Sequence, residues 1–148
     1  TFDSFAALEA QVKKVRAELW RRFVDEHQII LDYTALDGSY IRPTPEDCLA
    51  MKPSALSWGV PNEDGPMFNG LYLDAACNRW LITKKEEDRA KARRMIEGLI
   101  TVSTIGKTPG FIARGIATDG KTTYSMGSND QVGRAAPTGL HRPLATGL

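Results

Sequence analysis

Two acidic residues stand in polar, glycine-containing segments on either side of an apolar stretch. Glu63 belongs to Pro-Asn-Glu-Asp-Gly, and Asp130 follows Gly-Ser-Asn. Hydrolysis of a glycosidic bond needs one protonated carboxyl that assists the leaving oxygen and one ionised carboxyl that activates water or attacks. Glu63 and Asp130 are therefore the candidate catalytic pair. The alternative is that Glu63 caps a helix and Asp130 closes a turn.

Residues suited to sugar binding surround the same two segments. Sugar rings stack on aromatic faces, and their hydroxyls pair with guanidinium and amide groups. The candidate substrate-binding residues are Trp58, Asn69, Arg114, Tyr124 and Gln131. The glycines between residues 110 and 131 let the backbone turn sharply, so that such side chains converge. A plain surface loop with two turns is the alternative for this segment.

Three long helices must position these residues. Apolar residues at spacings of three and four predict helices over residues 4–25, 66–82 and 84–103. Asp3 or Ser4 suits the first cap, and Thr83 begins a capping-box pattern before the third helix. The short link between the second and third helices predicts an antiparallel αα-hairpin. Its two outer loops, and with them the candidate carboxylates, then emerge at one end.

Shorter elements are expected between the first two long helices. Residues 29–33 predict a strand or extended segment, and residues 36–39 predict a turn. Thr44 and the proline after it suit the start of a short helix, which Pro53 would end. Residues 132–148 are rich in proline and glycine, which favours an irregular tail. The expected organisation is one helical portion over 1–131 and this tail.

Composition excludes several classes of protein. Nineteen basic and 18 acidic residues give a net charge of +1, which argues against nucleic-acid binding through a broad basic face. No apolar run reaches the roughly 18 residues of a membrane span, and no cofactor motif is present, so we expect no cofactor. The first residue is Thr, and no signal peptide is visible, which is compatible with a trimmed secreted or periplasmic chain.

The cysteines and histidines do not predict a metal site. Cys48 and Cys77 have no zinc-finger spacing, and the two histidines are far from them in the sequence. The cysteines could pair once in an oxidising compartment. Two free, buried thiols are the favoured alternative.

Two segments resemble one family of proteins. They are WGVPNEDGPMFNGLYLDAACNRW, residues 58–80, and PGFIARGIATDGKTTYSMGSNDQ, residues 109–131. Both resemble the N-terminal portion of bacterial proteins with the six-hairpin, (α/α)6-toroid glycosidase-like fold. The resemblance covers about residues 5–131. It implies Glu63, Arg114, Asp130 and Gln131 as site positions, with Asp64 and Asn69 as adjacent candidates.

The resemblance implies a fold class and a general activity. The expected fold is mainly α, part of an (α/α) toroid of antiparallel hairpins with long loops at one end. The expected activity is that of a carbohydrate-active, glycoside hydrolase-like enzyme. A closed toroid needs many more helices than this chain supplies, so we expect either self-association or packing against the missing remainder. A non-catalytic module that binds sugar or protein, or an inactive structural fragment, is the alternative.

Overall fold

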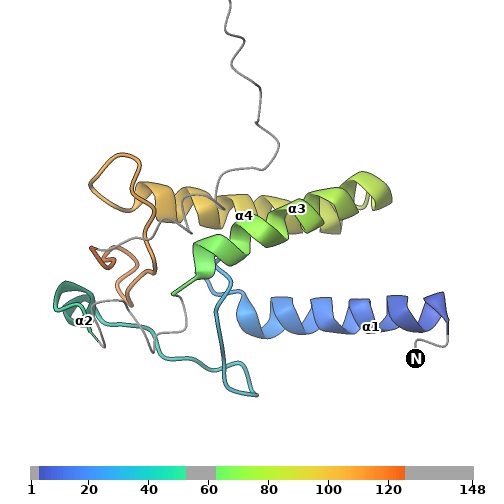
Figure 1. The fold of residues 1–148 in the computed structure, drawn as a ribbon, viewed down its shortest axis with the longest axis horizontal. Helices are drawn as coiled ribbons and strands as arrows, with labels where there is room; N and C mark the ends of the chain where they lie inside the picture. The colour runs from blue at the N-terminus through green and yellow to red at the C-terminus, as the bar shows by residue number, and fades with distance from the viewer. Residues whose placement is uncertain (1–3, 53–62, 126–148) are drawn as a thin grey trace, which may run out of the picture.

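The computed structural model describes residues 4–52 and 63–125, and this part of the chain is mainly helical (Figure 1). The elements, in order, are α1 (Phe5–Glu18), the π-helix η1 (Leu19–Phe23), α2 (Pro45–Leu49), α3 (Gly65–Thr83) and α4 (Glu86–Thr104). Within the described residues, β geometry is limited to one isolated antiparallel bridge between Val24 and Ile30. The mainly-α class is thereby confirmed. None of the described helices is long and apolar enough to cross a membrane.

The first helix begins where the sequence predicts, but its apolar stripe is not buried. The Ser4 hydroxyl accepts a hydrogen bond of 3.2 Å from the Ala7 amide, which confirms the cap. No residue of α1 is buried, and Phe5 and Val15 are 83% and 68% exposed. The amphipathic pattern therefore predicts the helix, but the apolar face of this helix is exposed to solvent. An ion pair of 2.8 Å between Arg16 and Asp88 ties α1 to α4.

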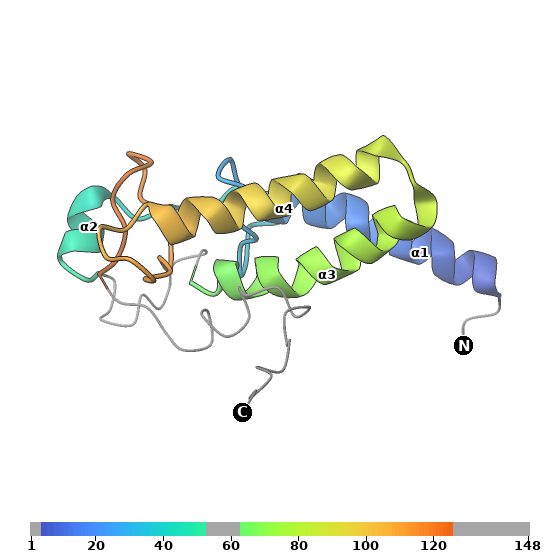
Figure 2. The same cartoon turned by 90° about the horizontal axis from the view of Figure 1, so that it is seen from above.

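Helices α3 and α4 lie side by side and run in opposite directions (Figure 2). Their bounds agree with the expected helices over 66–82 and 84–103 to within two residues. The chain reverses at Lys84, which adopts a left-handed conformation with φ of 55°. A Cβ atom on Gly98 would lie only 2.2 Å from the Gln28 carbonyl oxygen. Glycine therefore lets α4 approach the segment that follows α1.

The capping box expected at residues 83–86 does not form. Thr83 is the last residue of α3, and the N-cap of α4 is Lys85, which makes no side-chain cap bond. The Thr83 hydroxyl instead donates a 2.7 Å hydrogen bond to Asp88, a carboxylate that is 1% exposed and also accepts from Arg79. A charge-assisted bond to a buried carboxylate outweighs one to an exposed helix amide.

A capping box forms instead at α2. The Thr44 hydroxyl accepts from the Asp47 amide at 3.1 Å, and the Asp47 carboxylate accepts from the Thr44 amide at 3.0 Å. The expected cap and the proline at the first helical turn are therefore confirmed. Cys48, on this helix, is buried and free; Cys77 is also free but only half-buried.

The segment after α4 folds back over the end of the helix pair. The Ala113 amide donates to the Val102 carbonyl at 2.9 Å, and these two residues pack with Ile29 and Ile116 in one buried cluster. A second buried cluster joins Cys48, Ala117 and Tyr124 and so connects this segment to α2. Residues 105–125 therefore form an ordered layer, which gathers with α2 at the end where α3 begins and α4 ends (Figures 1 and 2).

Candidate functional site

Asn69 holds the segment before Asp32 against the helix pair. Its amide oxygen accepts from the Ile30 amide at 2.8 Å, and its amide nitrogen donates to the Gln28 carbonyl at 2.7 Å. Asp32 follows directly, and both of its carboxylate oxygens accept from the Asp64 amide, at 3.1 and 3.2 Å. Two hydrogen-bonded links thus bring Asp32 to the start of α3.

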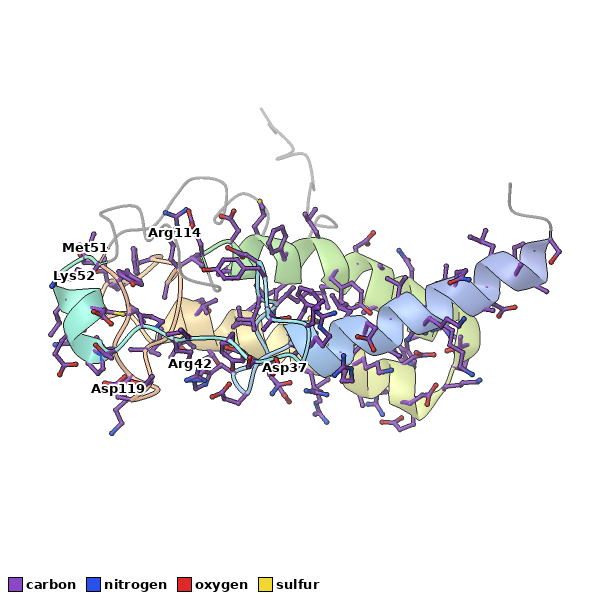
Figure 3. All side chains as sticks on the ribbon, turned by 90° about the horizontal axis from the view of Figure 1, so that it is seen from below. Asp37, Arg42, Met51, Lys52, Arg114 and Asp119 are labelled. Atoms are coloured by element: carbon purple, nitrogen blue, oxygen red, sulfur yellow. The ribbon has the colours of Figure 1, made fainter. Side chains whose placement is uncertain are left out.

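Arg114 connects the same point to the segment after α4. Its guanidinium donates to Glu63 at 3.3 Å and lies 3.7 Å from a carboxylate oxygen of Asp64. Arg114 is 8% exposed, and Figure 3 shows it near the start of α3. The sequence predicts a site shared by Glu63 and Asp130 with Arg114 nearby. The structure places Arg114 beside Glu63, whereas Asp130 lies outside the described residues.

Burial raises the pKa of two carboxyl groups at this point, those of Asp32 and Glu63. Burial, together with the nearby charges of Asp64 and Glu63, raises the pKa of Asp32 to about 6, against the lowering effect of its hydrogen bond with the Asp64 amide. Burial also raises the pKa of Glu63, although the Arg114 guanidinium opposes the shift. A carboxyl with a pKa near neutrality serves as a proton donor more readily than an ordinary aspartate.

Tyr33 adds an aromatic ring beside these carboxylates. Burial, followed by the charges of Asp32 and Glu63, raises the pKa of its phenol. The residue is nevertheless 48% exposed, so part of its ring faces solvent. It therefore offers the kind of surface on which a sugar ring stacks.

Asp32 and Tyr33 were not among the residues selected from the sequence. Both end the apolar run at residues 29–33, for which the sequence predicts only a strand or extended segment. The available signal was an acidic and an aromatic residue placed directly between a buried run and a turn. Nothing in that pattern indicated that the run would end beside Glu63, because the contact depends on the hydrogen bonds of Asn69.

Two expected substrate-binding residues have structural roles instead. Asn69 has no exposed surface, and its hydrogen bonds go to backbone groups. Tyr124 is also fully buried, and its hydroxyl donates to the carbonyl of Lys52. These contacts correct the two assignments: the buried amide and the buried phenol form hydrogen bonds with backbone groups of the protein. Trp58, Asp130 and Gln131 lie outside the described residues, so their roles stay predictions.

No metal site accompanies the cluster of Asp32, Glu63, Asp64 and Arg114. Within residues 4–52 and 63–125, no group of three or more histidine, cysteine, aspartate or glutamate side chains is arranged to hold a metal ion. The chemistry this arrangement can perform is proton transfer between carboxyl groups of unequal pKa, next to a fixed guanidinium.

Comparisons with known protein families, with curated proteins and with solved structures find no significant match.

Proposed function

We propose that this chain carries part of the active site of a carbohydrate-active, glycoside hydrolase-like enzyme. The observation that supports the proposal best is the pairing of two carboxyl groups with different environments. The pKa of Asp32 is raised to about 6. Burial raises the pKa of Glu63 as well, but the guanidinium 3.3 Å away opposes that shift and favours the ionised form. Two carboxyls with distinct protonation states are what glycoside hydrolysis requires.

In this proposal Asp32 is the acid and Glu63 is the ionised partner. Asp32 donates its proton to the leaving oxygen as the glycosidic carbon–oxygen bond breaks. Glu63 either takes a proton from the water that attacks the sugar carbon or attacks that carbon itself, after which water releases the sugar. Over the whole reaction, water supplies a hydroxyl to the sugar carbon and a proton to the leaving alcohol. Asp130 stays a predicted catalytic residue, because it lies outside the residues that the structure describes.

The arrangement of the helices supports an incomplete (α/α) toroid. The antiparallel pair α3 and α4 is the repeating unit of such a fold, with its loops at one end. Several large apolar side chains on these two helices remain exposed, as they would be at the junction with further helices. They are Leu71, Leu81, Ile82, Ile96 and Ile100. We propose that the rest of a toroid, or a second copy of the chain, covers them.

The activity is tested by release of reducing sugar from a panel of oligosaccharides and aryl glycosides. The assay uses the protein encoded by the full reading frame to which this chain belongs, and its single variants Asp32→Asn and Glu63→Gln. Asp74→Asn, an exposed residue on α3, is the matched control. Each site variant should lower kcat by a factor of at least about 100, and the control should leave it unchanged. Unchanged turnover in both site variants would contradict the proposal.

A partner-binding module is the second candidate function, because the same exposed apolar side chains suit a protein interface. Such a module would bind its partner without hydrolysing any glycoside. In such a module, the substitutions Asp32→Asn and Glu63→Gln should leave the affinity for the partner unchanged. Loss of glycoside turnover in these variants, with the affinity for the partner unchanged, would exclude a module without enzymatic activity.

A further inference from the structure

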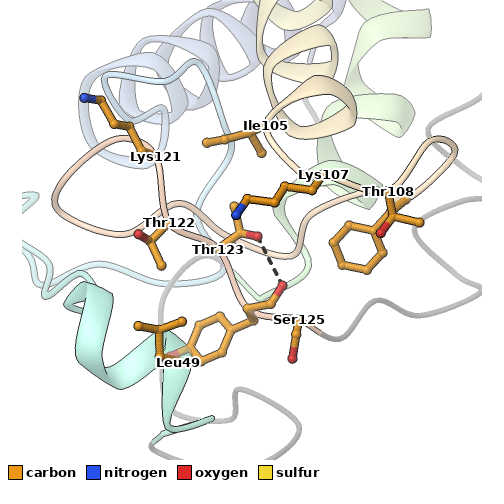
Figure 4. A pocket seen from close by; sticks show the side chains of 11 residues that line it. Leu49, Ile105, Lys107, Thr108, Lys121, Thr122, Thr123 and Ser125 are labelled. Atoms are coloured by element: carbon orange, nitrogen blue, oxygen red, sulfur yellow. Dashed lines mark hydrogen bonds between the residues drawn. The ribbon is translucent and has the colours of Figure 1, made fainter.

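A concave site lies apart from the carboxylate cluster, between α2, the end of α4 and the segment after it (Figure 4). Its cavity has a volume of about 360 Å³. Small-molecule sites span about 300–1,000 Å³, so this one fits a ligand of about the size of one sugar unit. The proposed hydrolysis does not use this cavity.

The polar lining of this cavity is basic and rich in hydroxyls. Of the described residues that line it, none is an aspartate or glutamate. Hydroxyls come from Thr108, Thr122, Thr123 and Ser125, and a charge from Lys107. In Figure 4 the Lys107 side chain runs toward Thr123, whereas the Lys121 side chain points away from the other lining residues. Lys107 is exposed and forms no ion pair within the described part of the chain.

Aromatic and aliphatic groups complete the cavity. The Phe111 ring lies against Gly106, just beyond the end of α4, where a Cβ atom would lie 3.0 Å from it. Tyr124 is fully buried, so it closes the wall without offering a free face. Asp119 lies in the same segment as the lining residues, and its carboxylate accepts hydrogen bonds from the amide and hydroxyl of Thr122 at 2.8 and 2.7 Å. The negative charge of Asp119 is therefore already hydrogen-bonded by Thr122.

We infer that this cavity binds a small polyhydroxylated anion, such as a sugar acid or a sugar phosphate. The Lys107 ammonium supplies the charge-assisted hydrogen bonds for the carboxylate or phosphate. The hydroxyls of Thr122, Thr123 and Ser125 already donate to Asp119, to the Tyr124 carbonyl and to the Met51 sulfur. They therefore serve as acceptors for the hydroxyls of the ligand. The competing explanation is structural, since a lysine beside a helix C-terminus also interacts favourably with the last carbonyl groups. That role needs no ligand.

Binding to the complete chain distinguishes the two explanations. Gluconate, glucose 6-phosphate, glucose and inorganic phosphate are titrated by calorimetry, while amide NMR shifts locate the contact. Gluconate or glucose 6-phosphate should shift the amides of residues 105–108 and 121–125, and the tighter of the two identifies the anionic group. Glucose and inorganic phosphate should each bind at least about tenfold more weakly, because each lacks half of the recognised groups.

Variants of exposed residues test which group binds the anion. Lys107→Met should weaken binding by about tenfold to a hundredfold, as expected for loss of a hydrogen bond to a charged group. Lys121→Met is the matched control and should change affinity by less than about twofold. Unchanged affinity in Lys107→Met, no shift in these amides, or equal binding of glucose and the two anions would overturn the inference. The outcome is independent of glycosidase activity, because Lys107 lies outside the carboxylate cluster and binding is measured without turnover.

Discussion

The Glu63 carboxylate accepts a hydrogen bond of 3.3 Å from Arg114, a residue 51 positions later in the chain. This contact joins the entry to α3 with the segment that leaves α4. Asp32 reaches the same point from a third segment through its hydrogen bonds with the Asp64 amide. Three separate parts of the sequence thus place charged groups at one end of an antiparallel helix pair.

Asn69 should prove essential for stability. Asn69→Ala leaves the buried Ile30 amide and Gln28 carbonyl without their partners, which should lower the free energy of unfolding by about 2–5 kcal/mol. Chemical denaturation measures the change. Asn78→Ala, an exposed position on the same helix, is the control and should have little effect. A loss below about 0.5 kcal/mol for Asn69→Ala would show that the amide is not a structural link.

Thr83 should matter through Asp88 and not through a helix cap. Thr83→Val removes a donor from a carboxylate that is 1% exposed, so we expect a loss of about 1.5–3 kcal/mol in unfolding free energy. Ser103→Ala is the control, because that exposed hydroxyl bonds only to a carbonyl of its own helix. In the double variant with Asp88→Asn, the cost of Thr83→Val should shrink. An equal loss of unfolding free energy in both backgrounds would show that Thr83 does not act through Asp88.

Asp32 should make the protein less stable as the pH rises. Its folded pKa, about 6, exceeds the ordinary value of 3.8, so the folded state binds the proton more tightly than the unfolded state. Its contribution is fully present below pH 3.8 and is lost as the pH rises through about 6. Relative to the native chain, Asp32→Asn should therefore gain stability between these pH values. Parallel denaturation curves at several pH values measure this; a constant difference would contradict it.

The isolated chain should self-associate through its apolar helix faces. Ile96 and Ile100 are 43% and 55% exposed and, four residues apart on α4, share one face. Multi-angle light scattering should give a mass above 16.3 kDa that rises with concentration. Replacing both isoleucines with glutamate should shift the mass toward that of the monomer, whereas Ala90→Glu, at an exposed position on another face of α4, should not. A monodisperse native monomer would contradict the need for a partner.

The sequence predicted the long helices because their apolar periodicity is a local signal, as is the Ser4 cap of the first helix. It placed Arg114 near Glu63 because a short link between two helices returns the chain to the same end, but it did not predict their hydrogen bond. It missed Asp32 and misplaced Asn69, since both roles depend on hydrogen bonds between segments about 30–40 residues apart in the sequence. The exposed stripe of α1 shows the same limit: periodicity identifies an apolar face but not what covers it.

The central claim, that Asp32 is a proton donor beside an ionised Glu63, is tested most directly by carboxyl ¹³C NMR titration. The carboxyl carbon of Asp32 should titrate with a midpoint near 6. Arg114→Met should raise the midpoint of Glu63 further, because the guanidinium lowers its pKa. Arg93→Met, an exposed residue on α4, is the control and should leave both midpoints in place. An Asp32 midpoint at the ordinary value of 3.8 would contradict the account.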